Sequence, residues 1–323
     1  MAESLHPKAG RDPSEDPLSV AVTGGTGFIG GAVIRQLLQA NLRVKALVRT
    51  ASRASCFEAP GLSWISGDLN DADSLRRLIG ETTAVIHCAG SVRGRKEADF
   101  AAANVAGIGN IVRVAREETS CRSFLLLSSL AAREPDLSAY AASKRQGELI
   151  LREEGDGLDR LILRPPAVYG PGDRELLPLL QWLRRGMLFT PGRGEARFSL
   201  IFVTDLARAV RNWLLDGAAL SGCYELHDGK PNGYCWEEVR EIGADLYRRP
   251  VRRIAVPAGF LKTVAHLNAA AARVGGYRPM LTPGKVRELY HLDWVCDNTP
   301  FSSATRWRPE IDLRAGLLRT LGS

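Results

Sequence analysis

The sequence lacks a long apolar run. A membrane-spanning helix needs about 20 consecutive, mostly apolar residues. The strongest candidate, Ile254 to Leu267, is interrupted by Pro257, Lys262 and His266. Residues 1–17 are polar and rich in proline, without the apolar core of a secretion signal. We therefore expect a cytoplasmic protein with no transmembrane segment and a disordered tail at residues 1–17.

Cysteine and histidine are scarce and scattered. The 6 cysteines form no C-x-x-C pair, and no cluster of histidines accompanies them. This spacing argues against a disulfide framework and a zinc site. We expect free thiols in a reducing compartment and no metal ion.

Lysine contributes little of the positive charge. Only 7 of the 43 basic residues are lysine, and the formal net charge is +7. Residues 240–323 hold 14 Lys and Arg against 7 Asp and Glu, so the whole excess lies in the last quarter of the chain. Two interpretations stay open: a solvated arginine-rich face, or a surface for an anionic or membrane-associated partner. No nucleic-acid-binding motif accompanies the charge, so we expect no nucleic-acid partner.

Short apolar strands alternate with helical patterns over the first half of the chain. With 323 residues, 45% of them hydrophobic, the chain can bury a sizeable core. Strands that are apolar throughout and alternate with helices indicate a parallel sheet covered on both faces. We therefore predict an α/β fold with a doubly wound parallel sheet of the Rossmann type. The expected strands are 18–22, 44–48, 62–65, 84–87, 123–127 and 161–163, and the expected helices are 32–39, 71–79, 101–118 and 140–154.

The alternation weakens after about residue 170, where proline and glycine cluster at 171–172 and 191–194. Segments 200–215 and 222–227 are interpreted as strand and helix that return to the sheet. The prediction is a dinucleotide-binding domain of residues 18–170 plus about 199–227. Residues 171–198 plus 228–323 are expected to form a smaller, mostly helical, C-terminal substrate lobe.

A glycine-rich turn joins the first expected strand to the first helix. Gly24, Gly27 and Gly30 allow a tight turn, the approach of the backbone to a pyrophosphate, and close packing of helix on strand. The helix N-terminus adds free N–H groups and the positive end of its dipole. We assign this turn to a dinucleotide cofactor rather than to an ordinary tight turn. Thr26, Phe28 and Ile29 belong to the same site.

The end of the second strand indicates the type of cofactor. An acid at this position typically holds the ribose 2′-OH of NAD, whereas arginine suits the 2′-phosphate of NADP. The chain has Arg49 and Arg53 here, with no acid between them. We favour NADP(H) and leave NAD(H) open, because Arg49 is also compatible with a plain surface position. After the third strand, Asp68 and Leu69 are placed to meet the adenine; alternatively, Asp68 caps the following helix.

A tyrosine and a lysine stand four residues apart on an expected helix. Tyr140 and Lys144 therefore face the same way. A neighbouring ammonium group lowers the pKa of a phenol, which is ordinarily about 10, and makes the tyrosine useful as a general acid or base. The pair by itself is also compatible with a solvated helix face.

Two further polar residues are candidates for the same site. Ser128 and Ser129 follow an apolar strand, and ligands bind at the carboxyl ends of parallel strands, so one of the two hydroxyls could hold a substrate oxygen beside Tyr140. The alternative is a turn that ends the strand. Asn104 lies in a helical pattern, where an amide is mildly unfavourable. It could hold a water or a backbone carbonyl, or it could be an exposed polar residue.

Several motifs follow one another along the chain. They are Thr23-Gly-x-x-Gly-x-x-Gly30, Gly67-Asp-Leu69, His87-Cys-Ala-Gly90, Asn104-Val-x-Gly107, Ser128-Ser129, Tyr140-x-x-x-Lys144, Arg164-Pro-Pro-Ala-Val-Tyr-Gly-Pro-Gly172 and Phe202-Val-Thr-Asp205-Leu-Ala. In this order the chain resembles the extended short-chain dehydrogenase/reductases, often called NAD-dependent epimerases/dehydratases. The resemblance covers about residues 19–227 and is looser to the end.

The resemblance implies a role for each matching position. Ser129 matches the substrate-orienting hydroxyl, Tyr140 the acid/base, and Lys144 the residue that lowers its pKa and binds the nicotinamide ribose. Asn104 matches an asparagine associated with a water relay. The remaining implied cofactor contacts are Asp68, Leu69, Cys88, Ala89, Gly90, Pro165 and Val168, with Gly90 standing where many relatives carry alanine.

The implied reaction is hydride transfer between a nicotinamide and a carbonyl or secondary alcohol. Arg49 favours an NADP(H)-dependent reductase or dehydrogenase that resembles the 3β-hydroxysteroid dehydrogenase and dihydroflavonol reductase branches. The second hypothesis is a nucleotide-sugar epimerase that retains its cofactor. Arg197 resembles the arginine that contacts a substrate phosphate in that branch; alternatively, it forms a structural ion pair. Dehydration is disfavoured, because Leu130 and Ala131 replace the Asp-Glu pair of the dehydratases.

A non-catalytic NADPH-binding module is the third hypothesis, and the intact Ser129, Tyr140 and Lys144 argue against it. We expect a small-molecule substrate and leave open a homodimer and a peripheral membrane contact. Residues 248–253 with the segment 254–267 are interpreted as a solvated turn and a core helix rather than as a membrane surface. Trp182, Phe189 and Phe260 are interpreted as core packing rather than as a substrate pocket.

Overall fold

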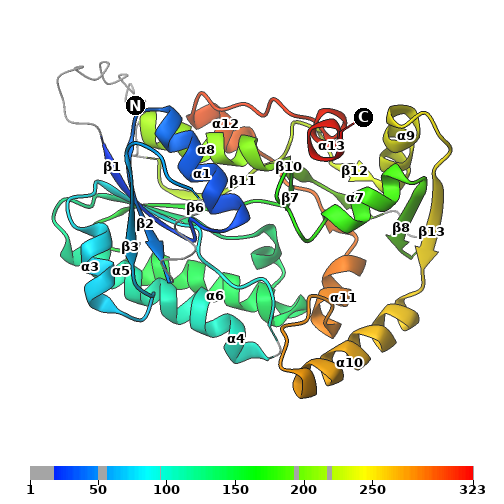
Figure 1. The fold of residues 1–323 in the computed structure, drawn as a ribbon, viewed down its shortest axis with the longest axis horizontal. Helices are drawn as coiled ribbons and strands as arrows, with labels where there is room; N and C mark the ends of the chain where they lie inside the picture. Colours follow the sequence, from blue (N-terminus) through cyan, green and yellow to red (C-terminus); the bar gives the residue numbers. More distant parts are fainter. Residues whose placement is uncertain (1–17, 50–56, 95, 193–195, 217–219, 323) are drawn as a thin grey trace, which may run out of the picture.

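The centre of the molecule is a sheet of seven parallel strands (Figure 1). The computed structural model describes residues 18–49, 57–94, 96–192, 196–216 and 220–322. The strands lie in the order β11-β6-β5-β4-β1-β2-β3, which confirms the predicted fold class. Their bounds are β1 (Ser19–Thr23), β2 (Arg43–Val48), β3 (Leu62–Ser66), β4 (Ala84–His87), β5 (Ser123–Leu127), β6 (Asp159–Arg164) and β11 (Gly222–Glu225).

Helices cover both faces of this sheet, because its central strands point apolar side chains in both directions. Val20 and Val22 of β1 belong to one buried core, and Ala21 between them belongs to the other. Helices α1 (Phe28–Gln39) and α8 (Val203–Leu215) complete the first core. Helices α3 (Ala72–Ile79), α5 (Gly107–Glu117) and α6 (Ala139–Glu154) complete the second (Figure 1).

Two of the expected helices differ from the observed ones. The first helix begins at Phe28, inside the glycine turn, rather than at residue 32. The long helix expected at 101–118 is divided into α4 (Glu97–Ala101), a π-helical turn η1 (Ala102–Ala106) and α5. Such turns often occur at functional sites, because the wider turn re-aims the side chains around it. Asn104 lies within this one.

The direction of the chain crossings reverses between β1 and β4. Strands β2 and β3 lie to one side of β1, and β4, β5 and β6 lie to the other. At such a switch point the connections leave in opposite directions, and a crevice opens at the carboxyl ends of the strands. The glycine turn after β1 and the motif after β4 both lie at this edge.

The smaller lobe combines helices with short strands (Figure 1). The expectation that segment 200–215 returns to the large sheet is wrong for its strand, because β10 (Leu200–Phe202) pairs with β7 (Ala167–Tyr169) in a separate ladder. Only β11 rejoins the large sheet, beside β6. The other strands are β8 (Met187–Pro191), β9 (Arg197–Phe198), β12 (Tyr234–Cys235), β13 (Arg252–Val256) and β14 (Asp293–Trp294). The helices are α7 (Leu177–Arg184), α9 (Trp236–Leu246), α10 (Ala258–Gly275), α11 (Pro283–Tyr290), α12 (Thr299–Ala304) and α13 (Leu313–Leu321), with 3-10 turns η2 (Leu130–Arg133) and η3 (Pro135–Leu137) after β5.

The C-terminal part of the chain packs back onto the large sheet. Phe301 and Trp307 are fully buried in the same core as Trp213 of α8. The Trp307 indole donates to the Asp205 carbonyl at 2.9 Å, and the Asp205 carboxylate accepts the backbone N–H groups of Glu310 and Ile311. Residues beyond 298 therefore contribute to the core of the cofactor-binding sheet as well as to the smaller lobe.

Helix α10 departs from its sequence-based interpretation. Among its residues only Ala265 and Ala272 are buried, and Phe260 is 61% exposed. The core-helix interpretation is therefore wrong, and so is the assignment of Phe260 to core packing. Trp182 is also exposed and contacts Phe189 edge to face.

Across the described ranges, no helix is long and apolar enough to span a membrane. The five described cysteines are free thiols. The tail at residues 1–17 and Arg53 lie outside the described residues.

Candidate active site

The glycine turn is shaped by contacts that leave no room for side chains. A Cβ on Gly24, which has φ +73°, would lie 2.6 Å from the Ala89 nitrogen, and a Cβ on Gly30 would lie 2.2 Å from the Gly24 carbonyl oxygen. Gly27 caps α1 without any side-chain hydrogen bond, so the first N–H groups of the helix have no internal partner. This exposed cradle fits the pyrophosphate of a dinucleotide.

Thr23 and His87 form the floor of the crevice at the ends of β1 and β4. The Thr23 hydroxyl shares a 2.9 Å hydrogen bond with Nδ1 of His87 and accepts the N–H of Ala89 at 3.3 Å. Burial, with a smaller contribution from Lys144, lowers the pKa of His87 to about 3, so the ring is neutral. Its Nε2 has no partner among the described residues. Burial also raises the pKa of Cys88 to about 12, so this thiol is unreactive.

Arg49 extends from the end of β2 into solvent. It forms no ion pair or hydrogen bond with any residue that the structure describes, so its guanidinium is available to a ligand. Its expected companion Arg53 falls outside the described ranges. The preference for NADP(H) that Arg49 suggested stays a prediction.

Asp68 does not cap α3. Its carboxylate accepts the backbone N–H of Asn70 at 3.0 Å and the side-chain amide of the same residue at 2.8 Å. Asp71 caps the helix instead. Leu69 packs beneath Gly107, where a Cβ would lie 2.9 Å from the leucine Cδ1. The capping alternative for Asp68 is therefore wrong, and its contact with adenine stays a prediction.

Ser129 and Tyr140 meet where β5 ends and α6 begins. Ser138 caps α6 by accepting the N–H of Ala141 at 3.0 Å, which places Tyr140 in the first turn. The Ser129 side chain lies near the phenol of Tyr140 and lowers its pKa, while the serine Oγ accepts the N–H of Ala131 at 3.2 Å. Phe100 packs edge to face on the tyrosine ring, with centroids 6.2 Å apart. The tyrosine is thus held between a hydroxyl and an aromatic wall.

Lys144 and Asn104 both pack closely against Gly90. The Lys144 ammonium is buried and donates to the Leu127 carbonyl at 3.1 Å. A Cβ on Gly90 would lie 3.2 Å from the Lys144 Nζ and 2.9 Å from the Asn104 Oδ1. Glycine at this position therefore lets the loop after β4 pack closely on both polar groups. This is a physical reason why the chain has glycine where many relatives carry alanine.

Asn104 joins three segments of the site. Its Oδ1 accepts the N–H of Ser91 at 2.8 Å, and its amide donates to the Ser91 carbonyl and to the Ser143 hydroxyl, both at 3.0 Å. The π-helical turn brings the side chain to this buried position. Asn104 thereby connects the loop after β4 to α6; its part in a water relay stays a prediction.

The pKa of Tyr140 shifts in the direction opposite to the expectation. Burial raises it to about 12, the neighbouring Ser129 side chain opposes this shift, and Glu288 adds to it. The expectation of a lowered pKa is wrong here because removing the phenolate from water outweighs the other influences. The pKa of Lys144 is lowered to about 8, mainly by burial, while Cys88 and Glu148 oppose this. At neutral pH the tyrosine is protonated and the lysine is charged.

Glu148 is a buried carboxylate that the sequence analysis missed. It accepts hydrogen bonds from the Ser128 hydroxyl at 2.6 Å and from two nitrogens of Arg164 at 2.8 and 2.6 Å. These contacts tie α6 to the ends of β5 and β6, beside Ser129. The spacing in the sequence could have indicated Glu148, since it stands one helical turn after Lys144 and faces the same way.

Replacing Glu148 by glutamine is expected to move the pH dependence of the enzyme. The charge of Glu148 holds the pKa of Lys144 up, so the Glu148→Gln variant has a Lys144 pKa lower than about 8. The ammonium is present below its pKa and is lost above it. The alkaline limb of kcat/KM for carbonyl reduction therefore shifts to lower pH in the variant. Glu153→Gln, an exposed change on the same helix, serves as the control; an identical limb in both variants would contradict the role of Glu148.

Pro165 and Val168 follow β6 at the same edge of the sheet. The Pro165 carbonyl accepts the N–H of Leu130 at 2.8 Å, which places this backbone beside the turn that carries Ser129. Val168 pairs with Ile201 in the β7–β10 ladder. Both positions therefore border the site, and their contact with a nicotinamide stays a prediction.

Arg197 is engaged by the protein itself. Its guanidinium donates to the carbonyls of Asn232 at 2.7 Å and Gly233 at 3.2 Å, and it pairs with Glu238 at 3.6 Å. This bonding is that of the structural ion pair named above as the alternative. No described contact joins Arg197 to Ser129, Tyr140 or Lys144.

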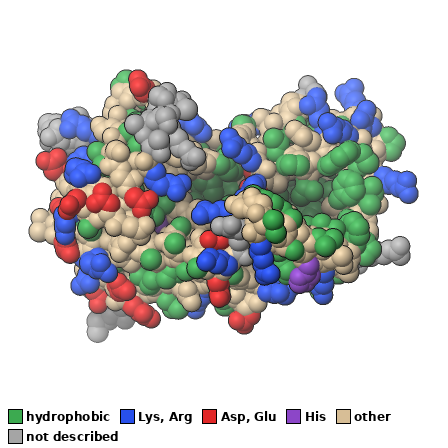
Figure 2. All heavy atoms as spheres, turned by 60° about the horizontal axis from the view of Figure 1, so that its bottom comes forward, with side chains coloured by type: hydrophobic (Ala, Val, Ile, Leu, Met, Phe, Trp, Pro, Cys, Tyr) green, Lys and Arg blue, Asp and Glu red, His purple; other side chains and the backbone are tan. Residues whose placement is uncertain are grey.

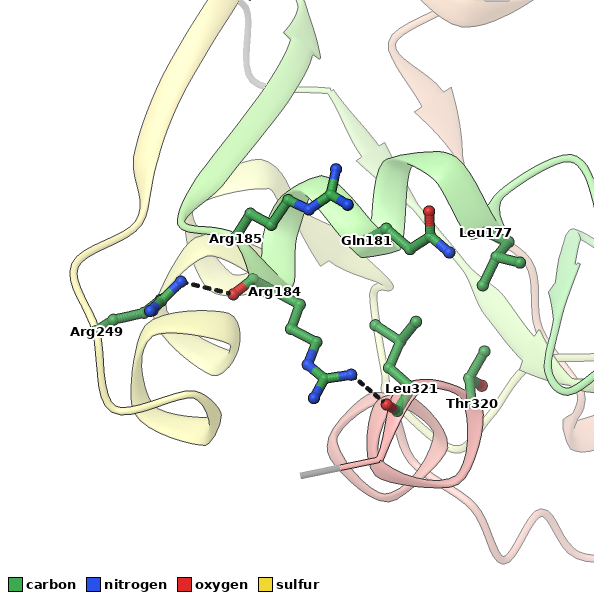
Figure 3. Close-up of a pocket in the computed structure, with 7 residues that line it drawn as sticks. All are labelled: Leu177, Gln181, Arg184, Arg185, Arg249, Thr320 and Leu321. Carbon is green, nitrogen blue, oxygen red and sulfur yellow. Dashed lines mark hydrogen bonds between the residues drawn. The ribbon is translucent and has the colours of Figure 1, made fainter.

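A separate cavity of about 520 Å³ lies in the smaller lobe (Figure 3). Arg184 donates to the Leu321 carbonyl, and Arg249 donates to the Arg184 carbonyl. The guanidinium of Arg185 stacks on Trp182 at 5.2 Å. None of the catalytic candidates lines this cavity, and its arginines are exposed. No group of three or more metal-ligating side chains lies in the described ranges either.

A dinucleotide cradle with a tyrosine–lysine pair at the same sheet edge is the architecture of an NAD(P)-dependent oxidoreductase. Residues 20–220 match the model of the "NAD dependent epimerase/dehydratase family". The chain belongs to this family, and it is an NAD(P)-dependent oxidoreductase of the extended short-chain dehydrogenase/reductase type.

Individual relatives extend the likeness over most of the chain. A ceramide reductase of Caulobacter vibrioides is 34% identical, covering 88% of this chain and 87% of the relative. The decarboxylating sterol-4-alpha-carboxylate 3-dehydrogenase erg26 of Schizosaccharomyces pombe is 27% identical over 94% of this chain and 97% of its own. UDP-glucuronic acid 4-epimerase from Bacillus cereus, in complex with NAD, has a TM-score of 0.72 at 16% identity, covering 94% and 95% of the two chains. The last likeness shows the shared fold.

Proposed function

We propose that the protein is an NADP(H)-dependent reductase that converts a ketone on a lipid to a secondary alcohol, with Tyr140 as the proton donor. The observation that carries the proposal is the placement of the Ser129 side chain beside the phenol of Tyr140, with the buried ammonium of Lys144 on the same helix as the tyrosine. This cluster borders the crevice at which the glycine turn forms its cradle.

The protonation state of Tyr140 is the one that carbonyl reduction needs. Reduction of a carbonyl needs a proton for the developing alkoxide, and a phenol with a pKa of about 12 keeps that proton at neutral pH. Oxidation would need the phenolate, which is scarce under the same conditions. The raised pKa therefore favours the reductive direction.

Each residue has a part in this step. The nicotinamide cofactor, when bound, supplies the hydride that the carbonyl carbon accepts. The Ser129 hydroxyl orients the carbonyl oxygen, and Tyr140 gives its proton to that oxygen. The charge of Lys144 stabilises the phenolate that remains until it regains a proton from water. Asn104 holds the loop after β4 against α6, which keeps these groups in place.

Arg49→Asp is expected to weaken NADPH binding about 10–100-fold, the cost of losing hydrogen bonds to a charged group. NADH carries no 2′-phosphate, so its dissociation constant should change little. Titration of both reduced cofactors by fluorescence measures the two constants. Arg122→Asp is the matched control, because Arg122 is exposed and precedes β5 at the opposite edge of the sheet. An equal loss of affinity for NADPH and NADH would show that Arg49 does not bind the 2′-phosphate.

The lipid substrate is supported by the relatives named above, which include a ceramide reductase and a sterol dehydrogenase. Cofactor oxidation by the purified protein should be screened against long-chain ketones, keto-ceramide analogues, sterol ketones and nucleotide sugars. We expect NADPH consumption with the lipid ketones. Interconversion of a nucleotide sugar with no net consumption of NADPH, by a protein purified with bound cofactor, would overturn the proposal in favour of an epimerase.

A further inference from the structure

The outward face of α10 carries a line of large apolar side chains, although a helix on a protein surface normally turns polar residues outward. Phe260, Leu267 and Val274 are 61%, 66% and 94% exposed. They are spaced by seven residues, so they form one line along the helix. The buried residues of the helix, Ala265 and Ala272, lie on the opposite side. We call the line of Phe260, Leu267 and Val274 the α10 stripe.

The chain around α10 is rich in basic residues and has no acidic residue nearby in the sequence. The segment 246–287 contains nine Lys and Arg and neither Asp nor Glu. Lys262, His266 and Arg273 of α10 are also exposed and form a second line on the helix, apart from the stripe. Within the described part of the chain, neither Lys262 nor Arg273 has an ion-pair partner.

The surface view agrees with this distribution. Figure 2 brings the underside of Figure 1 forward and shows hydrophobic and basic side chains intermixed on the right half of the molecule, which holds the smaller lobe. Acidic side chains are gathered on the left and in the centre. This half of the surface therefore combines exposed apolar area with positive charge.

Helix α10 is connected to the catalytic helix through α11. Asn268 of α10 donates to the Leu281 carbonyl just before α11. On α11, Glu288 accepts a short hydrogen bond from Ser138, the N-cap of α6. Ser138 stands two residues before Tyr140. A surface that anchors α10 would therefore lie within one layer of helices of the candidate active site.

We propose that the α10 stripe docks on a lipid bilayer containing anionic phospholipids. Apolar side chains would enter the interface while Lys262 and Arg273 pair with lipid phosphates, the arrangement of an interfacial amphipathic helix. Because the segment 246–287 has basic residues and no acidic ones, its positive charge is complementary to an anionic surface. The straight line of apolar side chains fits a flat interface. The biological role of this docking rests on the proposed lipid substrate, since a bilayer would hold that substrate beside the active site. The docking itself is argued from the surface of α10.

The charge contribution is tested by sedimentation with vesicles of phosphatidylcholine, with and without phosphatidylglycerol. The protein should bind the mixed vesicles at least tenfold more tightly than the neutral ones. The double variant Lys262→Gln/Arg273→Gln should lose about 30-fold in affinity for the mixed vesicles, given the value of each basic residue near an anionic surface. Arg113→Gln, an exposed arginine of α5, is the control and should bind as the parent does. Equal binding to both kinds of vesicle would overturn the proposal.

The apolar contribution has its own variant. Phe260→Gln/Leu267→Gln should lower vesicle affinity by tenfold or more, because the buried area of both side chains is lost. Leu215→Gln changes an exposed leucine on α8 and is the matched control. Thermal unfolding of each variant verifies that it folds. Unchanged vesicle binding by the double variant would overturn the proposal. So would a parent protein that is a dimer without lipid while the same double variant is a monomer, because the stripe would then be a dimer interface.

The test is independent of the proposed reaction. Tyr140→Phe, which is expected to be inactive, should bind the mixed vesicles as tightly as the parent protein. Vesicle binding without any lipid-ketone reduction would contradict the proposed substrate and still support the docking surface. Reduction of lipid ketones without vesicle binding would do the reverse.

Discussion

Tyr140→Phe is expected to lower turnover by about 10²–10⁴-fold, the usual contribution of a positioned general acid. The variant keeps the ring and its contact with Phe100 but removes the proton that the carbonyl oxygen receives. Cofactor affinity should stay within about twofold, because the cradle at the glycine turn is untouched. Single-turnover oxidation of NADPH, together with a fluorescence titration of NADPH, separates the two quantities.

Tyr224→Phe is the matched control for the loss of a phenol hydroxyl. Tyr224 lies in β11, and its hydroxyl donates to the Ser221 carbonyl at an exposed position. This variant should keep full turnover. If Tyr140→Phe also kept turnover within a few-fold of the parent protein, Tyr140 would not be the proton donor and the mechanism would fail.

Gly30→Ala is expected to disrupt the cofactor cradle. The added Cβ would lie 2.2 Å from the carbonyl oxygen of Gly24. Because that oxygen belongs to the backbone, the turn itself must move. Overpacking of this kind lowers the free energy of unfolding by about 1–3 kcal/mol. Because the same turn presents N–H groups to the pyrophosphate, NADPH affinity should fall by more than tenfold. Urea unfolding and NADPH titration measure the two effects.

The neighbouring glycine provides the control for this change. A Cβ on Gly31 would lie 3.4 Å from the Gly25 carbonyl oxygen, an ordinary contact. Since alanine is the better helix former, Gly31→Ala should leave the unfolding free energy unchanged or raise it by up to about 1 kcal/mol. Equal effects of the two substitutions would show that the turn tolerates a side chain at position 30.

Strands were predicted best where local pattern and burial agree. The strands at 84–87 and 123–127 have the expected bounds, and every residue in them is buried. Short apolar runs between turn residues leave few alternatives for such segments. The glycine spacing likewise indicated the cofactor turn, because only glycine tolerates the contacts found there.

Predictions failed where the outcome depends on distant residues. The π-helical turn at 102–106 leaves no local signature, and it exists where Asn104 bonds to both Ser91 and Ser143. The strand at 200–202 is paired by β7 rather than by the large sheet. The pKa of Tyr140 rises because the surrounding elements bury it, and spacing along one helix cannot report that burial.

The sequence by itself determined the class of this protein: a dinucleotide-binding parallel sheet with a Ser129, Tyr140 and Lys144 cluster. Those features follow from periodicity and from spacing within one turn or one helix, which are local properties. The tertiary structure alone decided that Gly90 packs against Asn104 and Lys144, that Glu148 connects α6 to the ends of two strands, and that α10 turns its apolar stripe outward. These depend on which segments meet after the chain has folded, since burial and electrostatics are set by neighbours from other elements.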